Sequence, residues 1–363
     1  MIKSIIAWFA FLTFVLTSER LYADTLTNPI QFSGYIETYY GYDFSNPDEL
    51  SRPDFLYSYH RHNEVNLNLG YIKTAYLKDG VRGNFALMTG TYAAANLAGE
   101  PALARSIFEA NAGVKVSRKM ELWIDAGVFA SHIGFESAVG ANCWTMTRSI
   151  LADNSPYYES GVKLSYTSAS GKWFLSALVL NGWQRIYRLS GSEMPSFGHQ
   201  ITWTPNKKVV LNSSSYIGRE DPLGSKSMRY FHNFFGQFQL SEQLGLIAGF
   251  DIGAQQQAKG SEVYEVWYSP VLIARYTPTE RFALAARAEY YSDEDRVIVA
   301  SPGNYGFQTL GYSFNTDLRV RENVLWRVEF RSFKSHMGEI FRDAKGNSTR
   351  LNHYLGTSLS IGF

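Results

Sequence analysis

Cysteine and charge are both scarce in this sequence. Cys143 is the single cysteine among 363 residues, so no disulfide can form within the chain and no metal cluster built from cysteines is possible. An oxidising compartment favours such sparse use, because a spare thiol is a liability there. Charged residues make up 18% of the chain and the formal net charge is +1, with no basic stripe that could neutralise phosphates. We therefore expect no nucleic acid partner.

Long apolar runs and catalytic signatures are missing as well. Past the first twenty-odd residues, no stretch of about 20 apolar residues is present, which excludes a bundle of membrane-spanning helices. A membrane β-barrel passes this test, because only every second residue of its strands faces lipid. No GxSxG elbow, P-loop, dinucleotide fingerprint or HExxH occurs. We expect neither enzymatic activity nor a cofactor.

The start of the chain has the features of a signal peptide. Lys3 supplies the positive charge, Ile5–Leu16 is an apolar core too short for an ordinary membrane helix, and Ala23 is a small residue before the expected cut. No cysteine follows the cut, so lipoprotein processing is not indicated. We expect a signal peptide over residues 1–23 and one mature domain over residues 24–363.

The mature region repeats one pattern, a segment of about ten residues in which apolar and polar side chains alternate. In the segment 324–331, valine, tryptophan and phenylalanine hold the even positions, whereas arginine and glutamate hold the odd positions from 327 on. Sixteen candidate strands are predicted: Phe32–Tyr42, Asn63–Lys73, Val81–Tyr92, Ile107–Val116, Leu122–Phe129, Tyr158–Thr167, Trp173–Gly182, Phe197–Thr204, Val209–Gly218, Arg229–Gln239, Leu244–Ala254, Val263–Tyr276, Phe282–Tyr291, Phe307–Arg319, Val324–Lys334 and Arg350–Phe363.

The connections between these segments alternate between short and long. Pro205–Lys208 and Val320–Asn323 are short, whereas Asp43–His62 and Ala130–Tyr157 are long. This asymmetry is typical of outer-membrane barrels, which have tight periplasmic turns and long extracellular loops. A soluble β-sandwich would have strands of only about 5–6 residues. The sequence therefore predicts an all-β fold, a transmembrane antiparallel up-and-down β-barrel of about 16 strands with both termini at the periplasmic end.

Aromatic residues support this prediction. A girdle of aromatic side chains is expected at the lipid interface beside the short turns, and the alternation places these residues there: Tyr71, Tyr166, Trp203, Tyr276, Phe282 and Trp326. The last segment alternates up to Phe363, and a terminal strand that ends in an aromatic residue resembles the signal read by the barrel-assembly machinery. We expect Phe363 to be this assembly signal, and outer-membrane lipid and lipopolysaccharide to surround the wall.

Polar residues that face inward are the candidates for the functional site. Side chains cannot fill a barrel of about sixteen strands, so an aqueous channel is expected rather than an interior closed by ion pairs. We predict that the channel is lined by Glu37, Glu64, Arg82, Glu109, Lys115, Asp125, Glu159, Lys163, Asp251, Arg275, Arg287, Glu289, Asp317, Arg319, Arg327, Glu329 and Arg331.

The three predicted strands that begin at Phe282, Phe307 and Val324 form a wall with inward charges of both signs. Between residues 287 and 331, four of the predicted lining residues are positive and three are negative. One uncompensated arginine would give a weak anion preference or near-neutral selectivity. On the same wall we expect Val328 to contact lipid and Glu329 to be reached by water.

Other clusters carry weaker signals. His60, His62 and Glu64 would share one face of a strand and could hold a metal, but a polar lumen or loop edge is the favoured interpretation, so no metal is predicted. The acidic run Asp293–Asp295 could bind calcium or bridge lipopolysaccharide, although a solvated loop is favoured. His199 is predicted to face lipid, as an outer-membrane phospholipase would require, but no paired serine motif is evident.

A family resemblance is carried by several stretches of the first two-thirds of the chain: Phe32–Pro47 (FSGYIETYYGYDFSNP), His60–Tyr76, Arg82–Glu100, Ala126–Ser137, Thr147–Tyr166, Leu180–Gln184 and Thr202–Lys208. With these stretches the chain resembles the β-barrel porins described as OmpL-like, which are common in Bacteroidetes-type bacteria. The last third matches by pattern more than by motif. The resemblance implies an outer-membrane barrel with porin activity, and it supplies neither a substrate nor catalytic residues.

These observations lead to one hypothesis and one alternative. We interpret the chain as an outer-membrane porin, a passive diffusion channel for small hydrophilic solutes, in which the loop Ala130–Tyr157 could fold inward as a constriction. The alternative is a non-conducting barrel with a plugged lumen that acts as a surface adhesin or an assembly partner. Homo-oligomeric assembly is suggested by analogy only.

Overall fold

The computed structural model describes residues 28–189, 194–220, 227–302 and 305–363. The predicted signal peptide therefore lies outside the described residues. Within the described ranges, no helix is long and apolar enough to cross a membrane.

The described chain forms a closed antiparallel barrel of sixteen strands, in which each strand pairs with its neighbours in sequence and β1 pairs with β18 to close the ring. A small hairpin of β16 (Phe341–Arg342) and β17 (Ser348–Thr349) lies in the last loop. The barrel strands are β1 (Ile30–Asp43), β2 (Val65–Lys78), β3 (Val81–Thr89), β4 (Ile107–Lys115), β5 (Glu121–Ala130), β6 (Tyr158–Thr167), β7 (Trp173–Leu180), β8 (Ser196–Asn206), β9 (Val209–Glu220), β10 (Ser227–Gln239), β11 (Leu244–Gln256), β12 (Tyr264–Thr279), β13 (Phe282–Asp293), β14 (Phe307–Arg321), β15 (Val324–Ser335) and β18 (Leu351–Gly362).

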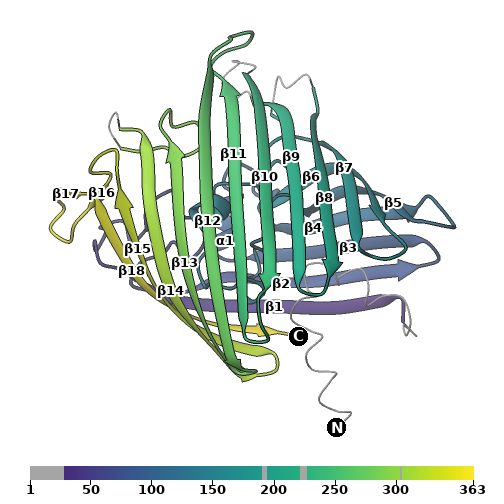
Figure 1. Cartoon of the computed structure of the whole chain (residues 1–363), viewed down its shortest axis with the longest axis horizontal. Helices are drawn as coiled ribbons and strands as arrows, with labels where there is room; N and C mark the ends of the chain where they lie inside the picture. Colours follow the sequence, from purple (N-terminus) through teal and green to yellow (C-terminus); the bar gives the residue numbers. More distant parts are fainter. Residues whose placement is uncertain (1–27, 190–193, 221–226, 303–304) are drawn as a thin grey trace.

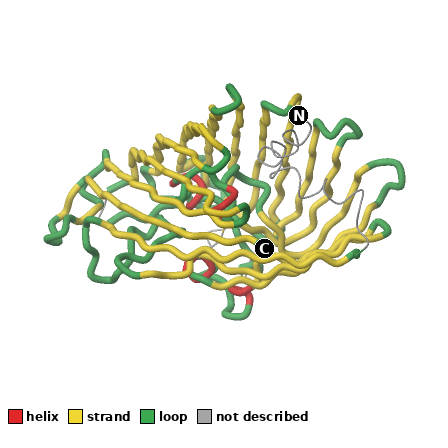
Figure 2. Tube along the Cα trace, turned by 90° about the horizontal axis from the view of Figure 1, so that it is seen from below, coloured by secondary structure: helices red, strands yellow, loops and turns green. Residues whose placement is uncertain are grey.

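The strands are strongly tilted. In Figure 1, β8 to β12 stand upright at the front, while β1 to β5 run almost horizontally behind them. Strands that tilt by about 35–45° from the barrel axis cross in this way when the near and far walls are seen together. Helical turns are short and few beside the strands, as Figure 2 shows. The predicted fold class and strand number are thus confirmed.

A bulge in β2 interrupts the alternation of inward and outward side chains and makes the predicted facing of Tyr71 wrong. Asn68 is an extra residue in β2, because Glu37 of β1 pairs with Leu69 while the next residue, Thr38, pairs with Leu67. Such a bulge reverses which side chains face inward beyond it. Tyr71 was predicted to point outward. It instead packs inside the barrel against Tyr35, with ring centres 5.9 Å apart.

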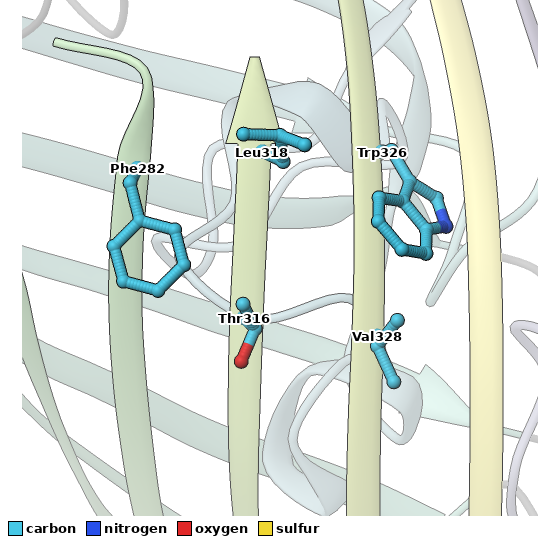
Figure 3. Close-up of a pocket in the computed structure, with 5 residues that line it drawn as sticks. All are labelled: Phe282, Thr316, Leu318, Trp326 and Val328. Atoms are coloured by element: carbon cyan, nitrogen blue, oxygen red, sulfur yellow. The ribbon is translucent and has the colours of Figure 1, made fainter. Parts of the chain in front are cut away.

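The outer wall exposes large apolar side chains on every strand pair, among them Val179, Phe234, Leu272 and Phe314. Trp173 and Trp203 stack with ring centres 5.5 Å apart beside short turns, as an interfacial girdle requires. A shallow hollow of about 290 Å³ lies on the outside of β13, β14 and β15. Figure 3 shows its lining of Phe282, Thr316, Leu318, Trp326 and Val328. Phe282, Trp326 and Val328 therefore face outward, as the alternation predicts.

Candidate functional site: the barrel interior

The connection between β5 and β6, residues 131–157, lies inside the barrel and is called the inner loop here. It contains the short helix α2 (Ile150–Asp153), capped by the Ser149 hydroxyl, which accepts the Ala152 N–H at 3.2 Å. Its side chains are shielded from solvent to an extent unusual for a loop, since Arg148, Ser149 and Ile150 are fully buried. Inward folding, raised above as a possibility for this loop, is what the structure shows.

Charged groups of the wall hold the inner loop at its centre. Glu329 on β15 accepts the Thr147 N–H at 2.6 Å and the Thr147 hydroxyl at 2.8 Å. Arg287 on β13 donates to the Thr147 carbonyl at 2.7 Å and forms an ion pair with Glu329 at 2.9 Å. Glu289 accepts the Ile150 N–H at 2.6 Å and pairs with Arg331 at 2.7 Å. These wall charges therefore bind the loop backbone as well as each other.

A second arginine anchors the preceding part of the inner loop. Arg327 donates to three loop carbonyls, those of Gly140 at 2.7 Å, Cys143 at 2.7 Å and Thr145 at 3.1 Å. Its remaining donors form a bidentate pair with Asp317 at 2.7 and 2.8 Å. Such planar, charge-assisted geometry is among the strongest that side chains offer.

The inner loop reaches the neighbouring strands on both sides of this anchor. Its Gly134 N–H donates to Asn233 on β10 at 3.2 Å, and its Ala141 N–H donates to the Tyr35 hydroxyl on β1 at 3.1 Å. His132 is hydrogen-bonded to the Ser215 carbonyl of β9 at 2.8 Å. The loop thus covers the half of the wall that runs from β9 through β15 and β18 to β1.

Two carboxyl groups of the inner loop are themselves buried. Burial raises the pKa of Asp153 to about 7, against the opposing effect of Arg331 and Arg148. Burial also raises the pKa of Glu136, although Arg287 lies 3.9 Å away and partly offsets the shift. The docked loop therefore holds these protons more tightly than a solvated loop would.

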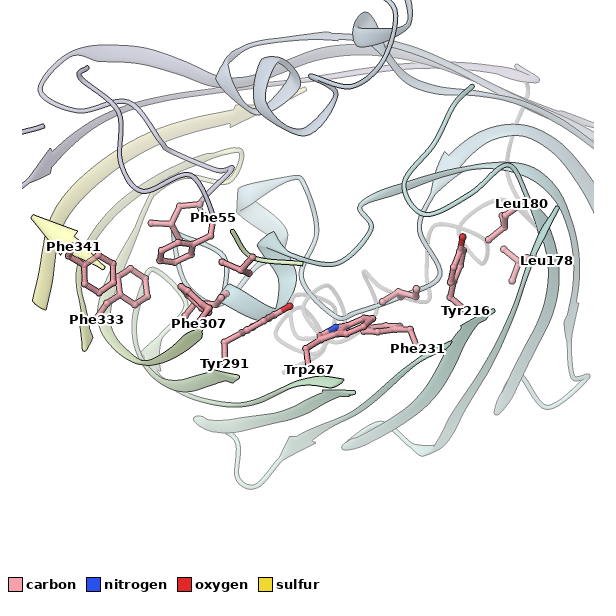
Figure 4. Close-up of a cluster of buried hydrophobic side chains, with 14 of the residues drawn as sticks. Phe55, Leu178, Leu180, Tyr216, Phe231, Trp267, Tyr291, Phe307, Phe333 and Phe341 are labelled. Atoms are coloured by element: carbon pink, nitrogen blue, oxygen red, sulfur yellow. The ribbon is translucent and has the colours of Figure 1, made fainter. Parts of the chain in front are cut away.

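An arc of apolar side chains lines the inner wall toward the long loops. Figure 4 shows it running from Leu178 and Leu180 past Tyr216, Phe231, Trp267, Tyr291, Phe307 and Phe333 to Phe341. Loop residues cover this arc, among them Phe55 and Leu56 from the first long connection and Ile133 and Ile150 from the inner loop. The upper interior is thus packed as a hydrophobic core.

Outside the covered part, the four strands β2 to β5 carry inward charges that stay partly exposed. The Lys73 side chain pairs with Glu109 at 2.6 Å, and the two are 25% and 16% exposed. Arg82 and Asp125 form a bidentate pair at 2.7 and 2.6 Å. Asp125 reaches Arg82 across Gly113, where an added Cβ would lie 2.2 Å from the Asp125 Oδ1. Lys115 at the end of β4 pairs with Glu121 at the start of β5.

The predicted lining residues thus fall into groups that the sequence did not separate. Glu109, Arg82, Lys115 and Lys163 are inward and partly exposed, with Asp125 buried against Arg82. Glu64 pairs with Arg61 just before β2, and Arg319 donates to the Glu322 carbonyl near a short turn. The buried members are Glu37, Glu159, Asp251, Arg275, Arg287, Glu289, Asp317, Arg327, Glu329 and Arg331. A channel-lining role for the whole set stays a prediction.

Burial corrects one expectation and reveals residues that were missed. Glu329 faces inward as predicted but is fully buried, so water does not reach it. Lys73 was not among the predicted lining residues, because the bulge at Asn68 changed its face and because β2 was expected to end there. Thr147 and Glu136 were missed because nothing in the sequence of a loop shows which wall it will touch.

The weaker metal hypothesis finds no support in the geometry. His62 accepts the Asp43 N–H through Nδ1 at 2.9 Å, and Glu64 is held by Arg61 at 2.6 Å. In the part of the chain that the structure describes, no three His, Cys, Asp or Glu side chains are grouped so that they could hold a metal ion.

The chain matches the family Putative beta-barrel porin-2, OmpL-like, over residues 29–363, and it belongs to this family. Membership implies an outer-membrane location and a porin role. No curated protein matches the sequence.

Solved structures with the same fold include several outer-membrane proteins. The anion-selective porin from Comamonas acidovorans aligns with a TM-score of 0.60 and 7% identity, over 92% of this chain and 99% of that one. Salmonella typhi OmpF in complex with daunomycin gives 0.60 and 9%, over 92% and 97%. A trimer form of OmpT from Vibrio cholerae gives 0.57 and 8%, over 92% and 99%. At such low identity the likeness concerns the fold alone.

Proposed function

We propose that the protein is a passive diffusion channel for small hydrophilic solutes, with its water path between the inner loop and the wall of β2 to β5. The observation that carries the proposal is the uneven exposure of inward charges. Lys73, Glu109 and Arg82 keep exposed surface, whereas Arg287, Arg327 and Glu329 are covered by the inner loop. The inner loop is then the constriction. The proposal involves no chemical step and no cofactor.

Selectivity follows from the exposed charges in this proposal. On the covered wall, four buried arginines, Arg275, Arg287, Arg327 and Arg331, face four buried carboxylates, since Glu136 of the inner loop joins Glu289, Asp317 and Glu329. The covered half of the wall therefore contributes little field. On the open part of the wall, Lys73, Arg82 and Lys115 each pair with a carboxylate. Because these lining charges are paired, we expect near-neutral selectivity.

Single-channel recording in planar bilayers tests the proposal. The native protein should conduct, and Lys73→Glu should move the reversal potential under a salt gradient toward cation selectivity, because it replaces a positive lining charge with a negative one beside Glu109. Lys345→Glu, in the exposed hairpin loop between β16 and β17, is the matched control and should leave the potential unchanged. Equal shifts in both variants, or none in Lys73→Glu, would mean that the water path does not pass this wall.

One observation favours the second candidate function, a non-conducting barrel that acts as an adhesin or assembly partner. Phe55 from the first long connection and Phe341 from the last one both pack on the apolar arc, so several loops close the upper interior. If the native protein does not conduct but a variant lacking residues 135–153 does, the inner loop is a plug and this function is preferred.

A further inference from the structure

Four polar side chains gather on the outer wall of β8, β9 and β10, and are called the Ser–His patch here. The Ser215 hydroxyl is hydrogen-bonded to Nδ1 of His199 at 2.5 Å, and the Ser213 hydroxyl to Nε2 of His232 at 3.0 Å. The two imidazole rings lie 5.7 Å apart. His199 thus faces outward as predicted, and it has a serine partner that the sequence did not reveal.

The Ser–His patch lies within the apolar belt of the barrel. Ser215 pairs with His199 on one side and with His232 on the other, and it sits near the middle of β9. Trp203, on the outer face near the short turn, is four residues from His199 along β8, or about 13 Å. The apolar band of such barrels is about 25 Å tall. Exposed apolar residues surround the patch, including Ile217 and Phe234.

Lipid hydrocarbon offers no hydrogen-bond partners to the imidazole nitrogens of this patch. A neutral imidazole has one donor and one acceptor nitrogen, and each ring uses one of them in its bond to serine. Among the described residues, Nε2 of His199 and Nδ1 of His232 have no hydrogen-bond partner. In lipid, a polar group without a partner carries a free-energy penalty that water would otherwise remove. Two such nitrogens side by side therefore indicate that something other than lipid covers this surface.

We propose that the Ser–His patch is the contact surface for a second copy of this chain, related by a twofold axis that passes near Ser215. Each ring can take either neutral tautomer, with its serine hydroxyl as donor or as acceptor, so the two open nitrogens can present one donor and one acceptor. A donor nitrogen of one copy then meets an acceptor nitrogen of the other, which makes the surface complementary to itself, as a twofold contact requires. This inference does not depend on whether the lumen conducts.

The same side chains do not form a hydrolytic site. A serine nucleophile needs a base held in place by a third group and backbone donors aimed at the oxyanion. His199 has no such third group among the described residues, and Ser215 lies inside a strand that is paired on both sides. The pairing of serine with histidine is therefore assigned to assembly.

A second serine–histidine pair lies on the outer wall, at a position where no second copy of the chain is needed to satisfy it. Ser332 is hydrogen-bonded to Nδ1 of His353 at 2.9 Å. His353 is only two residues from the loop end of β18, where water and lipid headgroups reach it. We expect no contact between copies at this pair.

Disulfide formation in native membranes tests the proposal. In a Cys143→Ala background, which removes the native thiol, Ser215→Cys should give several-fold more covalent dimer on oxidation than Ala288→Cys. Ala288 is the matched control because it is exposed on the outside of β13 at mid-strand. Equal yields from the two variants would overturn the proposal, as would a threefold ring, which does not bring two copies of Ser215 together.

A second measurement separates loss of contact from loss of fold. The variant with His199→Leu and His232→Leu should be monomeric by light scattering in mild detergent, while keeping the heat-modifiable gel migration of a folded barrel; His353→Leu should remain dimeric. A monomeric native protein would overturn the proposal even if the barrel conducts normally.

Discussion

Replacing Glu329 with glutamine tests how firmly the wall holds the inner loop. The Glu329 carboxylate accepts two bonds from Thr147, at 2.6 and 2.8 Å, and one from Arg287 at 2.9 Å. Glutamine keeps one acceptor oxygen, but its NH₂ group faces the donors that the second carboxylate oxygen served. At least one hydrogen bond to a charged group is therefore lost, and such a bond contributes about 1.5–3 kcal/mol to stability.

Removing one partner of a buried ion pair usually destabilises a protein by about 3–5 kcal/mol. We expect the destabilisation by Glu329→Gln to stay below the upper end of this range. Arg287 retains Glu289 at 3.2 Å, so its charge stays partly compensated. We expect a loss of about 2–4 kcal/mol in the free energy that docks the inner loop, which raises the undocked population about 30- to 700-fold.

Trypsin provides the assay. Arg148 is the only lysine or arginine between 131 and 157, and it is fully buried when the inner loop is docked. Cleavage after Arg148 therefore follows the undocked population when docking is faster than cleavage. The control is Glu322→Gln, in the exposed turn between β14 and β15. Cleavage of Glu329→Gln at the native rate would refute the view that this carboxylate anchors the loop.

Three further predictions concern the wall, pH and the chain end. Val328→Arg should destabilise the folded barrel by about 2–4 kcal/mol in lipid refolding if the site lies near the midplane, and a neutral result would contradict its lipid exposure. Since burial raises the pKa of Asp153 to about 7, this carboxyl group favours docking as pH falls from 7 toward 4, whereas His132, whose pKa burial lowers to about 4, opposes docking over the same range. Between pH 7 and pH 4, the ratio of cleavage after Arg148 to cleavage at an exposed site should therefore fall in the native protein relative to Asp153→Asn. Deleting Phe363, whose ring covers Gly34, should reduce assembled barrel but not export; normal assembly would exclude a signal role.

The barrel itself could be predicted because lipid requires apolar side chains on the outer face of every strand, so that apolar and polar residues alternate along it. Tyr158–Thr167 matches β6 at both ends, and the remaining strands differ from their predicted bounds by a few residues. The prediction depends on unbroken alternation, so the single extra residue Asn68 was enough to place Tyr71 on the wrong face.

The interior could be predicted much less well. Its key contacts join residues far apart in the sequence, such as Thr147 and Glu329, which are separated by 182 positions. Alternation identified Arg287 and Glu329 as inward, but exposure to water depends on what else occupies the lumen. The sequence of the inner loop, with few charges and mixed small and apolar residues, gave no sign of which half of the barrel it would cover.

The way Arg327 holds the inner loop has a consequence for how this chain can diverge. Its guanidinium binds the carbonyls of Gly140, Cys143 and Thr145, which are main-chain atoms. Every amino acid provides the same carbonyl, so the side chains at positions 143 and 145 can change without removing the anchor. Related barrels can therefore vary these side chains of the inner loop while keeping its path through the lumen.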